Sequence, residues 1–409
     1  MELVAQLGRY RVHHRIARGG MADVFLASPP GSVSREELVA IKRIRPDLVE
    51  DASFVSMFLD EARITRQLNH PNIACLLDWG EQDGVPYLVM EFVKGVSVKM
   101  LLTSSALPQH IAAEIGAEVA RALHAAHDQR GPDGERLGIV HRDVTPHNVM
   151  VTFEGQVKLL DFGIALARVR AERTRTGVLK GKWAYMSPEQ VAGLELDHRS
   201  DIFSLGSLLH EMLTGTRAFD GESPAEVLMR IMRSEPAPLE ELVPDIDPGL
   251  LTVLHRCHEK GRGERYQTAA DVARALDTVR QQMVASDPRR GSLSAYLGNN
   301  FAYRQVQIDK ALSQLEDRFQ PDAGLERDSQ TMVQEAPFLE LSGDLEALTS
   351  EETPGSQPGE RIPELAPIEP AHRDTALTWL VPVAVLLGLA LGLGVIVLVW
   401  YFTSATPEM

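Results

Sequence analysis

The sequence predicts an α+β fold in which strands come first and helices follow. Residues 10–27 alternate apolar and polar side chains, and residues 39–42 and 87–93 form short apolar runs. Residues 111–127 and 270–283 instead repeat apolar residues at helical spacing. Because a period of two indicates strands and a period of 3.6 indicates helices, a β-rich part should precede a larger helical part.

Length and charge narrow the class of protein. The 409 residues suffice for a two-lobed catalytic unit with additional segments. The formal net charge is −16, but residues 309–374 alone hold 16 acidic and 5 basic side chains. The rest of the chain is nearly balanced, so no nucleic-acid partner is predicted. The two cysteines, Cys75 and Cys257, lie in apolar or helical contexts typical of reduced thiols in the cytosol.

A turn of small residues joins the first two expected strands. Gly19 and Gly20 lie in it, between Ala17 and Val24. Such a loop can approach a phosphate closely, although a plain hairpin would explain this stretch taken alone. The next strand contains Ala40 and ends in Lys42, whose cation can hold phosphates if it points into a cleft; a surface lysine is the alternative.

The loop His-Arg-Asp-Val-Thr-Pro-His-Asn, residues 141–148, carries the chemistry. Asp143 can accept a proton from a hydroxyl, and Asn148 can reach a metal ion held by phosphates. Asp161, in Asp-Phe-Gly, supplies a second carboxylate for Mg²⁺. This combination indicates phosphoryl transfer.

These motifs, in this order, resemble the protein kinase superfamily from about residue 10 to residue 280. Their residue patterns are most similar to those of bacterial Hanks-type serine/threonine kinases. The resemblance implies a bilobal fold with a β-rich N-lobe at 10–93 and a helical C-lobe at 94–280. It also implies ATP with Mg²⁺ or Mn²⁺ as cofactors and proteins as substrates. One departure is that alanines, Ala17 and Ala22, replace two glycines of the family's loop, which weakens the inference of nucleotide binding.

The resemblance also assigns roles to single residues. Lys42 would hold the α- and β-phosphates and pair with Glu61, Asp143 would be the base, and Asn148 and Asp161 would bind the metal. The nucleotide would further contact Ala17, Gly19, Gly20, Val24, Ala40, Met90, Glu91 and Val93.

Further family positions concern regulation and scaffold. Arg142 would clamp a phosphorylated activation segment, in which Thr174 and Thr176 stand among arginines. Glu189 would form an internal ion pair with Arg265, and Asp201 would brace the catalytic loop. These last three residues are expected to act through stability.

Two departures from the family look like one exchange. Serine/threonine kinases place a lysine two residues after the catalytic aspartate and a threonine late in the activation segment. Here the first position is Thr145 and the second is Lys182. The resemblance therefore suggests that Lys182 supplies the cation and Thr145 the hydroxyl; alternatively, Lys182 points to solvent.

The C-terminal part is expected to tether the enzyme to a membrane. Residues 281–319 should form additional helices, and residues 320–376 should form an acidic, disordered linker. Residues 377–402 should form an apolar helix long enough to span a bilayer, and residues 403–409 a short tail. The kinase domain would then be cytoplasmic on a single-pass anchor. Gly388 and Gly392 would let two such helices pair, favouring a homodimer that phosphorylates itself in trans.

Two other functions stay open at this stage. The altered glycine loop is compatible with a pseudokinase that acts as a membrane scaffold, although Lys42, Glu61, Asp143, Asn148 and Asp161 are all present. The pair Lys182-Trp183 resembles tyrosine kinases, so tyrosine specificity is the second alternative.

Overall fold

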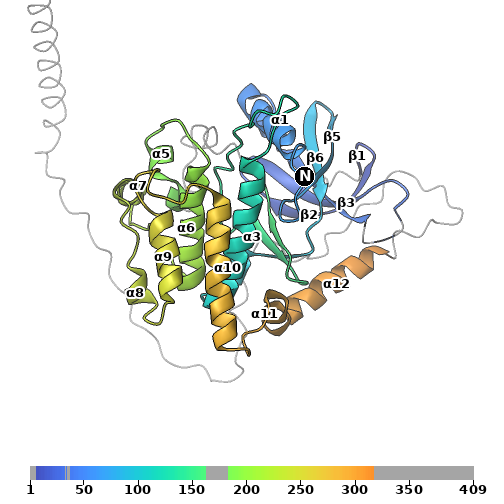
Figure 1. Cartoon of the computed structure of the whole chain (residues 1–409). Helices are drawn as coiled ribbons and strands as arrows, with labels where there is room; N and C mark the ends of the chain where they lie inside the picture. The colour runs from blue at the N-terminus through green and yellow to red at the C-terminus, as the bar shows by residue number, and fades with distance from the viewer. Residues whose placement is uncertain (1–5, 33, 35–36, 163–182, 317–409) are drawn as a thin grey trace, which may run out of the picture. The chain divides into compact units, whose positions relative to one another are not determined.

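The computed structural model describes residues 6–32, 34, 37–162 and 183–316, and its strands and helices separate into two lobes (Figure 1). Several predictions fall outside these residues: those on Thr174, Thr176, Lys182, Gly388 and Gly392, and on segments 320–376, 377–402 and 403–409. None of the helices in the described residues combines the length and the hydrophobicity needed to span a lipid bilayer.

The N-terminal lobe is built on a six-stranded antiparallel sheet. Its strand order is β1-β2-β3-β4-β6-β5. The strands are β1 Gln6–Leu7, β2 Tyr10–Arg18, β3 Ala22–Ser28, β4 Val39–Ile44, β5 Leu76–Gln82 and β6 Val85–Glu91. The alternating residues predicted at 10–27 thus form two paired strands, and only residues 19–21 connect them.

Helix α1, Ala52–Thr65, covers one face of this sheet after the short 3-10 turn η2, Pro46–Leu48. Phe54, Met57 and Phe58 of α1 are buried in one cluster with Ile44 and Leu88 of the strands. Successive residues of a strand point to opposite faces. Lys42, which pairs with Leu88 in the register, therefore lies on the face of the sheet that α1 covers.

A small second sheet follows the connection between the lobes. It comprises β7 Gly95–Ser97, β8 Val149–Thr152 and β9 Val157–Leu159, in that order, and the short helix α2, Val98–Leu101, follows β7. Strand β8 begins directly after the 141–148 loop, and β9 ends just before Asp161. The paired strands β8 and β9 therefore connect the end of the 141–148 loop to Asp161.

The second lobe is helical. Its helices are α3 Gln109–His127, α5 Pro188–Val191, α6 Arg199–Thr214, α7 Pro224–Arg233, α8 Leu239–Leu242, α9 Pro248–Cys257 and α10 Ala269–Ser286. Helices α3 and α10 lie side by side (Figure 1). A Cβ added to Gly116 of α3 would lie 2.5 Å from Leu209 Cδ2 and 3.1 Å from Leu276 Cδ1. Gly116 therefore leaves room for the ends of the Leu209 and Leu276 side chains where helices α3, α6 and α10 meet.

Two more helices, α11 Leu293–Asn300 and α12 Ala302–Glu316, follow α10 within the segment where an extension was expected. Ser292 caps α11 by accepting a hydrogen bond from the backbone N–H of Ala295. Leu293 and Leu297 of α11 are buried in the same core cluster as the helices of the second lobe. Helix α11 is therefore part of the folded domain.

Candidate active site

Lys42 and Glu61 form a buried ion pair beneath the six-stranded sheet. Lys42 Nζ lies 2.7 Å from Glu61 Oε1, and the two residues are 8 % and 9 % exposed. Glu61 lies one helical turn beyond Met57 and Phe58, whose burial fixes α1 on the sheet. The hydrophobic packing of α1 thus determines where the carboxylate meets the lysine.

The same lysine reaches the second lobe. Lys42 Nζ lies 2.9 Å from Asp161 Oδ1. Asp161 has the left-handed φ of 49°, and the Phe162 ring that follows is buried against the His141 ring, with centroids 4.7 Å apart. Because Phe162 is held in the core, the Asp161 carboxylate is directed to the lysine, and its side chain keeps 26 % exposure.

Hydrogen bonds between its own residues and to Leu160 organise the 141–148 loop, the candidate catalytic loop. Asn148 Nδ2 donates to the backbone oxygen of Asp143 at 2.9 Å and to Asp143 Oδ2 at 3.0 Å. The backbone N–H of Asp143 donates to His141 Nδ1, while His141 Nε2 lies 3.0 Å from the oxygen of Leu160. These contacts fit the His141 tautomer with its hydrogen on Nε2.

Asp201 of α6 holds the 141–148 loop in place through hydrogen bonds. Its carboxylate accepts hydrogen bonds of 2.8 Å from the backbone N–H groups of His141 and Arg142, and a third from His127 Nε2. Burial alone would raise the pKa of Asp201, but the hydrogen bond and charge of His127 hold it below its usual value. The contacts also fix Arg142 at the left-handed φ of 68°.

A cavity of about 270 Å³ lies between the lobes next to Lys42 and Asp161. Seven of the predicted nucleotide contacts line it: Ala17, Val24, Ala40, Lys42, Met90, Glu91 and Val93. Gly19 and Gly20 belong to the β2–β3 turn and are not among the residues that line it. The Glu91 side chain is fixed by an ion pair of 2.7 Å with the buried Lys158.

Sequence reasoning missed several residues of this cavity. Met150 comes two residues after Asn148, and Leu160 comes directly before Asp161. Their positions next to predicted metal ligands were a signal in the sequence. Ile308 of α12 also lines the cavity, and no local pattern pointed to it.

The residues present fit a nucleotide with a divalent metal ion. The cavity is lined by apolar side chains and by the paired Lys42 and Asp161, as an adenosine and a polyphosphate require. Among the described residues, no group of three His, Cys, Asp or Glu side chains could hold a metal. Asn148 and Asp161 could supply two oxygen ligands, and phosphates and water commonly complete the shell of Mg²⁺.

Four other predicted residues, Thr145, Arg142, Glu189 and Arg265, belong to the C-lobe. Thr145 is 2 % exposed, and its Oγ1 has no hydrogen-bond partner among the described residues. The Nε of Arg142 is likewise buried without a partner in that part of the chain. Glu189 and Arg265 form the predicted ion pair, and Ser200 Oγ donates to Glu189 Oε1 at 2.6 Å.

A strand-rich lobe, a helical lobe and a lysine bridged to two carboxylates between them are the arrangement of protein kinases. The family model for the protein kinase domain matches residues 10–276, and the chain belongs to this family. The predicted bilobal fold, with its β-rich N-lobe and helical C-lobe, is confirmed.

Similar proteins fall into two groups by name. The chain is 39 % identical over 304 residues to the tyrosine-protein kinase MasK of Myxococcus xanthus, covering 73 % of this chain and 47 % of MasK. It is 35 % identical over 274 residues to the serine/threonine-protein kinase PrkC of Bacillus subtilis, covering 66 % of this chain and 40 % of PrkC. The chain thus spans less than half of the length of these relatives.

A solved structure shows the same fold. The PknI kinase domain of Mycobacterium tuberculosis is 26 % identical and superposes with a TM-score of 0.52. The similarity covers 67 % of this chain and 97 % of that domain.

Proposed function

We propose that this protein kinase transfers the γ-phosphate of ATP to serine and threonine hydroxyls of proteins, including its own. The observation that carries the proposal is the position of Lys42, within 2.9 Å of carboxylates from both lobes. Bound ATP supplies the phosphoryl group and leaves as ADP, and Mg²⁺ held by Asp161 and Asn148 would offset the charge of the phosphates. Similarity to PrkC supports serine and threonine as acceptors.

Each residue of the site has a task in this proposal. Lys42, oriented by Glu61, holds the α- and β-phosphates, while Asp161 and Asn148 hold the metal. Asp143 orients the acceptor hydroxyl and takes its proton, and its carboxylate is positioned by Asn148 Nδ2. Asp201 keeps the loop in shape through two backbone N–H groups.

The test is phosphate incorporation from radiolabelled ATP in the presence of Mg²⁺, followed by phosphoamino-acid analysis. The chain should label serine and threonine, and Asp161→Ala should abolish labelling. No incorporation by the unsubstituted chain would instead favour the pseudokinase scaffold.

A second candidate is a tyrosine or dual-specificity kinase. Similarity to MasK favours it, and so does Lys182-Trp183 in the sequence. Phosphotyrosine as the main product would establish this candidate and remove the first.

We further propose that residues 377–402 anchor the enzyme in the cell membrane, with the kinase domain on the cytoplasmic side. The support is a segment without charged residues from 375 to 407, preceded by an acidic linker at 320–376. The enzyme should stay with membranes after alkaline extraction, and a variant without 377–402 should not.

We also propose that two such helices pair through Gly388 and Gly392, which would raise the local concentration of kinase domains. Self-association that is unchanged by Gly388→Leu/Gly392→Leu would count against this pairing.

A further inference from the structure

Helix α12 is docked by one apolar face. Ile308, Leu312 and Leu315 follow one another at spacings of four and three residues and are 5 %, 2 % and 1 % exposed. All three belong to the core cluster that includes Leu26 of the N-lobe sheet and the helices of the C-lobe. Tyr303 and Val306, elsewhere on α12, are more than 60 % exposed. The burial pattern is that of an amphipathic helix packed on the domain.

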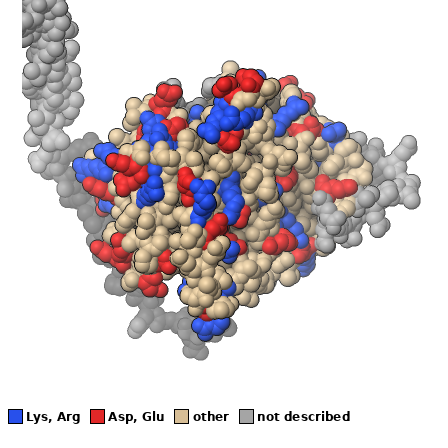
Figure 2. Space-filling view, in the orientation of Figure 1, with Lys and Arg blue, Asp and Glu red and all other residues tan. Residues whose placement is uncertain are grey.

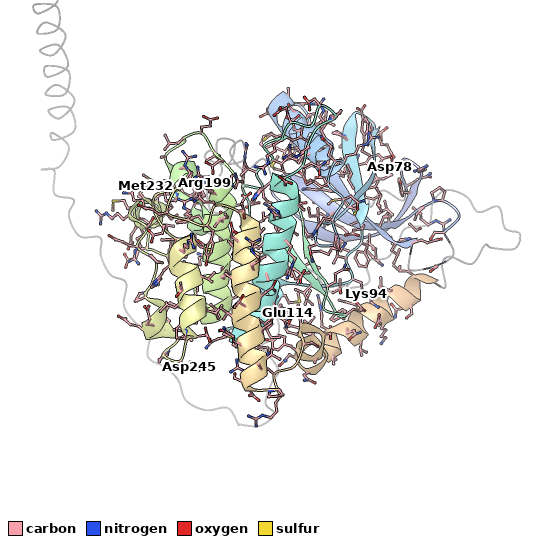
Figure 3. The ribbon with its side chains drawn as sticks, in the orientation of Figure 1. Asp78, Lys94, Glu114, Arg199, Met232 and Asp245 are labelled. Atoms are coloured by element: carbon pink, nitrogen blue, oxygen red, sulfur yellow. The ribbon has the colours of Figure 1, made fainter. Side chains whose placement is uncertain are left out.

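An ion pair aligns α12 with the connection between the lobes. Lys94 Nζ lies 2.5 Å from Asp309 Oδ1, and Lys94 stands between Val93 and Gly95, which both line the cavity. Figure 3 shows Lys94 beside α12. The two side chains are 34 % and 38 % exposed, so solvent screens their attraction. The apolar face therefore holds the helix, and the ion pair sets its register.

The residue before Asp309 reaches the cavity. Ile308 lines it together with Phe92 and Val93 of the connection and Ile16 of β2. Residues 302–316 lie beyond the 10–276 match to the kinase domain, so this part of the wall comes from the extension of this chain. Lys42 and Asp161, where the phosphates are expected, line the cavity through β4 and the segment after β9.

We propose that Ile308 is a nucleotide-binding residue that contacts the adenosine half of ATP at the connection between the lobes. The inference rests on the proposed function, because it takes ATP as the ligand. An apolar side chain here removes nucleoside surface from water and strengthens binding. Since its position is next to the connection and Asp143 is not among its neighbours in the cavity wall, Ile308 affects affinity and leaves the chemical step unchanged.

The experiment measures the Kd of the full chain for a non-hydrolysable ATP analogue with Mg²⁺, and the KM and kcat for ATP. Ile308→Ala should raise Kd and KM about fivefold, and Ile308→Val about twofold, with kcat unchanged. Val306→Ala is the matched control, because Val306 is 62 % exposed on the same helix and should change nothing. Lys94→Glu should weaken binding through misplacement of α12, and Lys94→Glu/Asp309→Lys should restore it.

The outcomes separate this inference from the proposed function. A Kd for Ile308→Ala equal to that of Val306→Ala would overturn the inference, and so would a lower Kd, because α12 would then obstruct the cavity. If the unsubstituted chain binds the analogue and Ile308→Ala weakens binding, but no phosphate is transferred, the inference stands and the proposed function fails. If the unsubstituted chain binds no nucleotide, both fail.

Discussion

Arg265 and Glu189 meet through two parallel contacts: Nη1 lies 2.7 Å from Oε1, and Nη2 lies 3.0 Å from Oε2. Arg265 has no exposed surface, and its guanidinium also donates to the backbone oxygens of Glu259, Lys260 and Arg199. The pair joins α5, in which the expected activation segment (residues 161–189) ends, to the segment before α10. It therefore ties α5 to the segment before α10 within the C-lobe.

We expect Glu189→Leu to lower the free energy of unfolding by about 3–5 kcal/mol, because the Arg265 charge would stay buried without its partner. Glu189→Leu/Arg265→Leu should lose less than the sum of the two single variants, and a urea denaturation series at pH 7 would measure the coupling. Additive losses would contradict the expectation. Arg274→Leu is the matched control, because that arginine is exposed and pairs with the partly exposed Asp271.

The stability of the C-lobe should depend on pH through His258. This residue is 5 % exposed, lies 3.2 Å through Nε2 from Ser207 Oγ, and packs edge-on against the rings of Phe203 and Phe219. Burial, followed by nearby positive charge, lowers its pKa to about 3. The unfolded chain takes up a proton near pH 6.5 while the folded chain does not, so stability is full above pH 6.5 and falls as the pH drops toward 3.

As the pH falls from 6.5 to 5, we expect this residue to lower the free energy of unfolding, with a slope that approaches about 1.4 kcal/mol per pH unit. His258→Gln should be less stable at pH 7 but should show a flatter dependence on pH in urea denaturation. His255→Gln is the control, because the His255 side chain is 59 % exposed. Equal slopes for the unsubstituted chain and His258→Gln would exclude His258 as the source.

Most residues of the candidate active site could be predicted from the sequence because they stand in short motifs of fixed spacing. Lys42, Asp143, Asn148 and Asp161 could be predicted from one strand and two loops. The structure places Lys42 beside Asp161 in the cavity wall and Asn148 beside Asp143 in the 141–148 loop. The Lys94–Asp309 pair could not be predicted, since 215 residues separate its members and nothing local specifies where α12 docks. Contacts of this kind follow from tertiary packing of an apolar face, which a helical pattern predicts without naming its partner.

The charge of the domain surface could not be predicted from the net charge of the chain. The net charge of −16 predicts an acidic molecule, but acidic and basic side chains are interspersed over the face of the described domain seen in Figure 2. The excess of acids lies in residues 309–374, of which only 309–316 are described. Net charge therefore describes residues 309–374 more than the domain that carries the site.

Phosphorylation of Thr174 or Thr176 should activate the enzyme. Arg142 is held at its backbone by Asp201 and Gln190, and its Nε is buried with no hydrogen-bond partner among the described residues. An arginine with a fixed backbone and an unused side-chain donor is suited to a phosphate, which it can bind through about one to three charge-assisted hydrogen bonds. Thr174→Ala/Thr176→Ala should lower kcat/KM by about tenfold or more.

The measurement compares phosphorylated and phosphatase-treated enzyme, with occupancy of both threonines read by mass spectrometry. In an Arg142→Gln background the two forms should have equal activity, because the clamp is gone. Undiminished turnover of Thr174→Ala/Thr176→Ala would remove the idea.

The last prediction concerns Thr145 and Lys182, which exchange the residue types usual in serine/threonine kinases. Thr145 stands two residues after Asp143 in a buried position, and its Oγ1 lacks a hydrogen-bond partner in the described part of the chain. A buried hydroxyl without a partner is unfavourable, so a group that completes the active site should bond to it. We expect Lys182, which lies outside the described residues, to supply the cation near Asp143 and the γ-phosphate.

The exchange is tested by a double-mutant cycle on kcat/KM. Thr145→Lys and Lys182→Thr should each reduce kcat/KM by about tenfold to a hundredfold, because each leaves the site with two like groups where one cation and one hydroxyl are needed. The combined variant should recover much of the loss, since the charge would keep its place and change only its point of attachment. Thr145→Val separates the hydroxyl from the shape of the side chain and should also impair catalysis. Purely additive losses, or full activity in Lys182→Ala, would show that Lys182 points to solvent and that the site works with one cation fewer.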